Sequence, residues 1–200
     1  MKIKVCLAAG VLVLSSIPAF AADQKSAPPM SPEQQKEMKM MKDAATPGEP
    51  HKKLAEMAGT WDATVTMWPA AGAPPMTSNG TAVNKTVLGG RYLQEEFSGT
   101  MMGGPFSGLG YTGYDNVAKQ YVGTWMDTWS TGFMNSTGTA DGKGTTTFTA
   151  TMSDPMTGKT AKATNKITIV SKDKHVMEMW GPGKDGKNYK MMEITYIRKK

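Results

Sequence analysis

Residues 59–67 read Gly59-Thr60-Trp61-Asp62-Ala63-Thr64-Val65-Thr66-Met67, a run in which apolar and polar side chains alternate. A period of two residues is typical of a β-strand with one buried face and one face in water. Similar runs recur as far as Arg198, and the segments between them are rich in Gly, Pro, Asn and Asp. This pattern predicts about ten short strands joined by tight turns.

The later strands are expected at about residues 80–88, 91–100, 106–114, 120–128, 133–139, 145–152, 161–169, 175–180 and 188–198. An antiparallel sheet of this length tends to curl and close, because closure removes its unpaired edges. We therefore predict an all-β fold, an antiparallel up-and-down barrel of about ten strands. Many inward candidates are Ala, Gly, Thr or Met, so we expect the interior to be incompletely filled and able to hold one small ligand.

The N-terminus has the pattern of a secretory signal. Lys2 and Lys4 precede an apolar stretch, Val5 to Phe20, and the small-x-small motif Ala19-Phe20-Ala21 overlaps its end. Such a stretch is shorter than the ~20 apolar residues of a membrane-spanning helix. We predict a cleaved signal peptide over residues 1–21, a periplasmic or secreted protein, and no membrane span.

Residues 22–50 are predicted to form a flexible tether with one short helix. Ser31 is positioned to cap a helix that begins at Pro32 and ends near Ala45, and Gln34 completes a capping box. The helix region is rich in methionine (Met30, Met38, Met40 and Met41). Thioethers bind Cu(I), which makes copper one alternative, but a flexible apolar face is the simpler interpretation.

Residues 51–200 are predicted to form the barrel domain. A second short helix is expected from His51 to Ala58, where Leu54 and Met57 share a face and would cover one end of the barrel.

Composition excludes several classes of function. The formal net charge is +6, but the lysines are scattered rather than gathered into a basic stripe, so no nucleic-acid partner is expected. The single cysteine, Cys6, lies inside the predicted signal. The mature protein is therefore expected to have no disulfide, thiolate metal site or cysteine nucleophile.

Several short segments together resemble the bacterial domain-of-unknown-function 1579 family, from about Pro47 to the C-terminus. These segments are His51-x-x-Leu54, Gly59-x-Trp61, Leu88-Gly89-Gly90-Arg91, Pro105-Phe106-x-Gly108, Gly113-Tyr114-Asp115-Asn116, Tyr121-Val122-x-Thr124-Trp125-x-Asp127, Asp154-Pro155-x-Thr157-Gly158-Lys159 and Glu193-Ile194-x-Tyr196-x-Arg198. The resemblance implies no established activity.

The Gly59-x-Trp61 opening and the late arginine, Arg198, are also similar to the calycin signature of lipocalins and their relatives. In that superfamily the arginine lies over the tryptophan at the closed end of the barrel. The resemblance implies that Arg198 stacks on Trp61, and that this pair closes the barrel and binds no ligand.

Five residues are predicted to bind the ligand. Trp125, Asp127 and Trp129 alternate on one strand face, and tryptophans with a few polar groups are typical of small-molecule sites. Arg91 and Glu193 are further charged candidates for the interior, where charges must pair because an isolated buried charge is very costly. The alternative is that these aromatic residues only fill the barrel and the charges pair with one another.

Two other patterns are given structural interpretations. Residues 108–113 match G-x-G-x-x-G, but no helix follows them, so we expect glycines of a sharply bent strand rather than a dinucleotide site. His175 shares a face with Met177 and Met179, which would suit haem iron or copper. We expect His175 instead to be solvent-exposed at a strand edge, and we assign no metal, cofactor or catalytic residue.

The sequence thus favours an exported binding module for a small, largely apolar ligand. One alternative is an enzyme that uses Asp127 or Glu193 as an acid or base inside the barrel. Another is an envelope interaction protein that uses the outer face of the barrel and the N-terminal helix.

Overall fold

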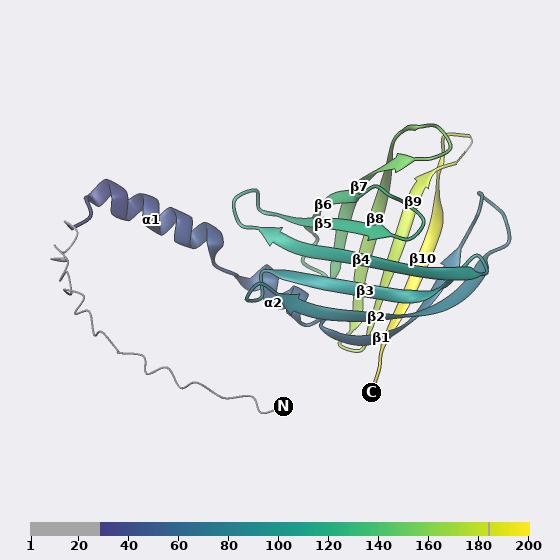
Figure 1. The fold of residues 1–200 in the computed structure, drawn as a ribbon, viewed down its shortest axis with the longest axis horizontal. Helices are drawn as coiled ribbons and strands as arrows, with labels where there is room; N and C mark the ends of the chain where they lie inside the picture. Colours follow the sequence, from purple (N-terminus) through teal and green to yellow (C-terminus); the bar gives the residue numbers. More distant parts are fainter. Residues whose placement is uncertain (1–28, 184) are drawn as a thin grey trace, which may run out of the picture.

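The computed structural model describes residues 29–183 and 185–200, so the predicted signal peptide and the start of the predicted tether lie outside the described residues. Ten antiparallel strands form a closed barrel (Figure 1). Each strand pairs with its neighbours along the chain, and the first strand pairs with the last. The predicted up-and-down barrel is confirmed.

The elements are α1 (Pro32–Ala45), α2 (Glu49–Ala55), β1 (Gly59–Met67), β2 (Met76–Val87), β3 (Tyr92–Met101), β4 (Gly104–Asp115), β5 (Gln120–Asp127), β6 (Met134–Ala140), β7 (Thr145–Asp154), β8 (Lys159–Ser171), β9 (Lys174–Pro182) and β10 (Asn188–Arg198). Strand β2 begins at Met76 rather than near Gly80, because residues 76–79 pair with the end of β1. Pairing to an existing strand here overrides the loop-like composition of the segment.

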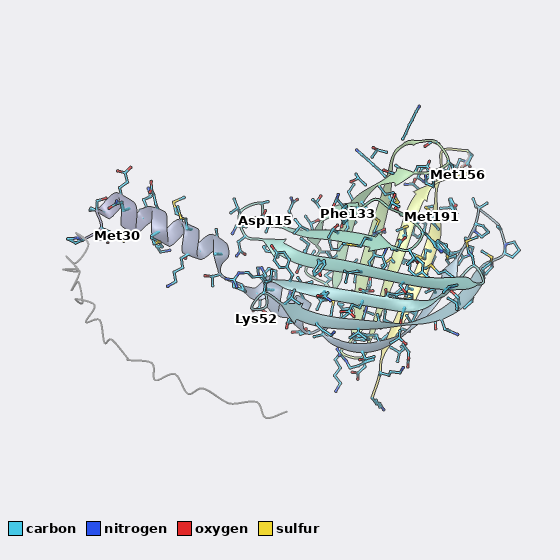
Figure 2. All side chains as sticks on the ribbon, viewed as in Figure 1. Met30, Lys52, Asp115, Phe133, Met156 and Met191 are labelled. Carbon is cyan, nitrogen blue, oxygen red and sulfur yellow. The ribbon has the colours of Figure 1, made fainter. Side chains whose placement is uncertain are left out.

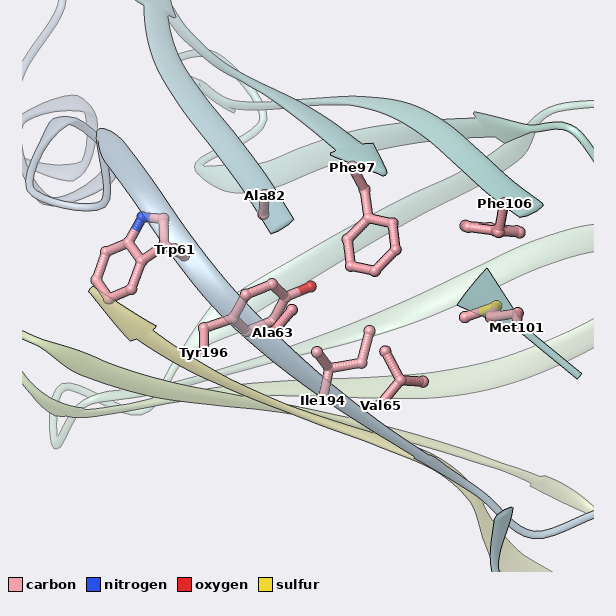
Figure 3. Close-up of a cluster of buried hydrophobic side chains, with 9 residues drawn as sticks. All are labelled: Trp61, Ala63, Val65, Ala82, Phe97, Met101, Phe106, Ile194 and Tyr196. Atoms are coloured by element: carbon pink, nitrogen blue, oxygen red, sulfur yellow. The ribbon is translucent and has the colours of Figure 1, made fainter. Parts of the chain in front are cut away.

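The apolar face of β1 points into the barrel, as its alternation predicts. Trp61, Ala63 and Val65 are buried, and β10 places Tyr196 opposite Ala63 and Ile194 opposite Val65. Figure 3 shows these side chains converging with residues of β2, β3 and β4 in one buried cluster. Burial of this apolar surface provides the main stabilisation of the fold, since the described residues contain no cysteine.

Arg198 closes one end of the barrel. Its guanidinium carbon lies 4.1 Å from the centroid of the Trp61 ring, which is the predicted stacking. The guanidinium also donates hydrogen bonds to the carbonyls of Ala58 and Glu56, at 2.6 and 2.8 Å. Gly59 has a φ of +132°, and a Cβ there would lie 2.6 Å from the Arg198 Nη1 atom. The Gly-x-Trp motif therefore needs its glycine both for backbone conformation and for room.

Helix α2 covers the same end of the barrel. Its Leu54 is buried against Leu93, Tyr121 and Phe148, and Met57, just after the helix, packs on this cluster. The prediction that Leu54 and Met57 cap the barrel is confirmed.

Helix α1 extends away from the barrel, with Met30 at its far end (Figure 2). Ser31 and Gln34 form the predicted capping box. None of the residues of α1 is buried, and the side-chain amide of Asn116 holds the end of the helix by donating to the carbonyls of Ala44 and Thr46. Within the part of the chain that the structure describes, no helix is both long and apolar enough to cross a membrane.

Candidate functional site

The barrel encloses a cavity of about 530 Å³. It reaches the surface beside Trp129 and Phe133, whose exposed fractions are 49% and 58%, and it extends inward to Met57 and His175. Most of its lining consists of aromatic rings and methionine side chains. These include Trp68, Phe97, Met101, Phe106, Tyr111, Trp125, Met134, Met152, Met177, Met179, Tyr189, Met191 and Met192. The barrel interior is thus incompletely filled, as its small and flexible inward residues predict.

Trp125 forms one wall of the cavity because β4 supplies glycines beneath it. Gly110 pairs with Trp125 across the β4–β5 ladder, and Gly108 pairs with Asp127. A Cβ at Gly108 would lie 2.1 Å from Trp125 Cζ2, and one at Gly110 would lie 2.8 Å from Trp125 Cε3. The indole therefore covers the backbone of both glycines. The G-x-G-x-x-G pattern lies within a strand, as predicted, but these two glycines make room for a ring.

Substituting Gly108 with alanine is expected to push the Trp125 indole out of position. We expect the free energy of unfolding to fall by about 1–3 kcal/mol, the usual cost of overpacking. Gly104→Ala is the matched control, because a Cβ at Gly104 in the same strand has only one neighbour within 4 Å, at 3.9 Å. Urea unfolding measures the stability and near-ultraviolet circular dichroism reports the indole. Equal behaviour of the two variants would contradict the packing role of Gly108.

Asp127 accepts hydrogen bonds from Trp125 and Trp129, which both line the cavity. Its Oδ2 atom accepts a hydrogen bond from the Trp125 indole N–H at 2.9 Å, and its Oδ1 atom accepts one from the Trp129 backbone N–H at 2.9 Å. The carboxylate thus orients the Trp125 ring on the wall and begins the loop that carries Trp129 to the rim. These three predicted site residues all line the cavity.

A polar group lies deeper in the cavity. The Tyr196 hydroxyl donates a hydrogen bond to Glu95 Oε1 at 3.2 Å, and both residues line the cavity. Glu95 is half-buried in the lining of the cavity, and desolvation raises the pKa of its carboxyl to about 7. The hydrogen bond from Tyr196 opposes this rise but is the weaker effect. Glu95 therefore titrates near neutral pH.

His175 is buried, with an exposed fraction of 2%, so the predicted exposure at a strand edge is wrong. In a closed barrel β9 has no free edge, and it pairs with both β8 and β10. The His175 ring stacks on Tyr196 at 4.4 Å between centroids and meets Trp61 edge-on at 4.4 Å. Desolvation and, secondarily, the charge of Arg198 lower the pKa of His175 to about 4, so its imidazole is neutral at pH 7.

Arg91 and Glu193 lie outside the cavity, unlike the other three predicted binding residues. Arg91 is exposed in the turn between β2 and β3, where its Nη1 donates to the Leu88 carbonyl. Glu193 points to the outer face of the barrel and pairs with Lys190. A β-bulge at Met191 changes the phase of β10. Turn geometry and this bulge decide the two positions, so the expected inward orientation is wrong for both.

Residues 46–198 match a family described as "Protein of unknown function (DUF1579)". The chain belongs to the DUF1579 family. No curated protein gives a significant match to this DUF1579 chain.

Among solved structures, the DUF1579 chain is similar to Rv2717c from M. tuberculosis, at 14% identity with a TM-score of 0.52, over 76% of this chain and 99% of that one. It is also similar to the S-type phycobiliprotein lyase CPES from Guillardia theta, at 12% identity and a TM-score of 0.52, over 80% of this chain and 97% of that one. At these identities the likeness shows the barrel fold alone.

Glu95, Asn165 and Tyr196 are among the polar residues of the DUF1579 cavity that the sequence did not identify as site residues. A signal existed for Glu95, because it alternates with Leu93 and Phe97, which both face inward. Asn165 has an exposed fraction of 8%, and its Oδ1 atom has no hydrogen-bond partner among the described residues. Across residues 29–183 and 185–200, no group of three or more His, Cys, Asp or Glu side chains is arranged to hold a metal ion.

Proposed function

We propose that this DUF1579 protein is an exported binding module that holds a small, largely apolar ligand in its barrel cavity. The supporting observation is the open cavity of about 530 Å³ beside Trp125 and Trp129. Small-molecule sites in proteins typically measure roughly 300–1,000 Å³ and are lined by apolar and aromatic groups with few polar ones. The methionine side chains add a surface that adapts its shape to the ligand.

Export is the second part of the proposal and rests on the signal pattern of residues 1–21. Cleavage after Ala21 would leave Ala22 as the mature N-terminus. Mass spectrometry of the protein recovered from the periplasm or the medium tests this directly, and an intact N-terminal methionine on all recovered protein would contradict it.

A lipophilic fluorophore tests ligand binding. N-phenyl-1-naphthylamine is expected to bind with a stoichiometry of one by native mass spectrometry and to quench tryptophan fluorescence. The quenching should decrease in Trp125→Phe, whose ring lines the cavity. Trp180→Phe is the matched control, because Trp180 does not line the cavity and lies under Lys166 on the other face of β9.

Loss of quenching in Trp180→Phe but not in Trp125→Phe would place the probe on the outer surface and overturn the proposed site. Absence of any binding by native mass spectrometry and fluorescence would overturn the binding function itself.

An enzyme with an in-barrel carboxylate is the second candidate, and the raised pKa of Glu95 favours it. Glu193 cannot serve in this role from the outer face, and both oxygens of Asp127 already accept hydrogen bonds. Any turnover found in a substrate screen should follow a pH profile with an inflection near 7 and be abolished in Glu95→Gln. A turnover that survives in Glu95→Gln removes this candidate.

A further inference from the structure

We infer that the cavity selects apolar ligands that carry a positive charge, such as a lipophilic amine or ammonium ion, over apolar anions such as fatty acids. This inference rests on the proposed binding function and adds the charge of the ligand to it.

The first observation is the sign of the charges in the lining. Among the described residues, the cavity is lined by two carboxylates, Glu95 and Asp127, and by no lysine or arginine. The whole chain has the opposite balance, with 23 Lys and Arg against 17 Asp and Glu. The basic side chains thus lie elsewhere, and the electrostatic field inside the barrel favours a cation.

The second observation is that neither carboxylate has a cationic partner. No ion pair among the described residues includes Glu95 or Asp127. Lys190 is the basic residue near the rim, with its Nζ atom 5.2 Å from the Trp68 ring centroid, but it pairs with two outer-face carboxylates. A partly buried carboxylate without a countercharge is costly, and a bound cation would offset that cost.

The third observation is the aromatic surface between the two carboxylates. Glu95 pairs with Gly110 on one side of β4, and Asp127 pairs with Gly108 on the other side. The Trp125 indole covers both glycines. A cation over this ring would lie between two negative charges and against the side chain that gives the strongest cation–π interaction.

The fourth observation is a pair of buried polar atoms without partners in the residues that line the cavity. Asn165 and His175 line the cavity, are each more than nine-tenths buried, and have Oδ1 and Nδ1 atoms without partners among the described residues. A carbonyl oxygen only accepts hydrogen bonds, and an ammonium group only donates them. The low pKa of His175 keeps its ring uncharged at neutral pH, so it does not repel a cation.

Three ligands with one alkyl chain and different head groups test the inference. We expect the full mature chain at pH 7.5 to bind decylamine at least ~10-fold more tightly than decanoic acid, a ratio worth about 1.4 kcal/mol, with decanol between them. Displacement of N-phenyl-1-naphthylamine measures the three affinities.

Substitution of the carboxylates identifies the source of the preference. In the double variant Glu95→Gln/Asp127→Asn the ratio of amine to acid affinity should fall to about threefold or less. The decanol affinity of the same variant reports any change in the packing of Trp125 and Trp129, which Asp127 orients. Glu96→Gln is the matched control, because Glu96 lies next to Glu95 but pairs with Lys85 on the outer face. If the double variant does not fold, the two single variants are expected to lower the ratio in smaller steps.

The possible outcomes distinguish charge selection from ligand binding itself. Equal or tighter binding of decanoic acid, or a preference that persists in the folded variants without these carboxylates, overturns charge selection but leaves ligand binding intact. Failure of all three ligands and of the fluorophore overturns the proposed function, and charge selection with it.

Discussion

Trp61→Ala is expected to lower the free energy of unfolding by about 3–5 kcal/mol, the range for removing a large buried aromatic side chain. Trp61 has an exposed fraction of 2%. The Arg198 guanidinium lies over its ring, the His175 ring makes a T-shaped contact with it, and its indole N–H donates to the Met57 carbonyl at 2.9 Å. The substitution therefore leaves a cavity and also frees the arginine that closes the barrel.

Trp129→Ala provides the matched comparison for Trp61→Ala. The Trp129 ring is about half exposed at the rim, so its removal should cost about 1 kcal/mol or less. Urea unfolding followed by far-ultraviolet circular dichroism measures both variants without depending on tryptophan fluorescence. Similar losses of stability in the two variants would show that Trp61 has no special role in closing the barrel.

Glu95 is expected to make the stability of the barrel depend on pH. The difference in the free energy of unfolding between Glu95→Gln and the natural protein is expected to change by about 1–3 kcal/mol in favour of the variant as the pH rises from 4.5 to 8. The upper bound reflects the size of the pKa shift of Glu95, and water in the cavity reduces it. Glutamine keeps the size and an acceptor for the Tyr196 hydroxyl but never becomes charged.

The sign follows from the two shifted groups that titrate in this window. Glu95 has a folded-state pKa of about 7 against 4.5 for the unfolded chain. The folded state therefore binds more protons between these values, and its stability falls as the pH rises. His175 has a folded-state pKa of about 4 against 6.5. Its unfolded form binds more protons between pH 4 and 6.5, so its contribution rises with pH.

In the natural protein these opposing slopes should largely cancel between pH 4.5 and 6.5. The free energy of unfolding should then fall near pH 7, where, of these two groups, only Glu95 still titrates. In Glu95→Gln the free energy of unfolding should rise between pH 4.5 and 6.5, because only the contribution of His175 remains. Hydrogen bonds lower the pKa values of the turn aspartates Asp115, Asp141 and Asp154 from 3.8, so these groups change the stability only at lower pH. Urea unfolding at several pH values measures the slopes, with Glu96→Gln as the control. Parallel curves for Glu95→Gln and the natural protein would show that Glu95 is not desolvated in the barrel.

Much of the architecture could be predicted from local patterns. The alternation in β1 predicts which of its residues face inward, since successive side chains of a strand point to opposite faces. The capping box of Ser31 and Gln34 predicts the start of α1, because it depends only on residues within one turn. The stacking of Arg198 on Trp61 was implied by the calycin resemblance and is present in the structure.

The candidate site was predictable only in part. Trp125, Asp127 and Trp129 alternate within one segment, and all three line the cavity. Arg91 was assigned to a strand but belongs to a turn, and Glu193 follows a bulge that the two-residue period does not reveal. Inward and outward positions exchange wherever a strand gains one residue. A single bulge therefore reverses the orientation that strict alternation predicts for the residues after it.

Local sequence patterns were sufficient to predict about ten strands, the buried faces of most of them and the helices before them, because these features depend on neighbouring residues. The meeting of Glu95, Tyr196 and His175 in the interior, and the packing of the Trp125 ring on two glycines of β4, appear only in the folded barrel. Those contacts depend on the register between strands distant in the chain and on closure of the sheet. Desolvation inside that closed barrel, rather than any local motif, shifts the pKa values of Glu95 and His175.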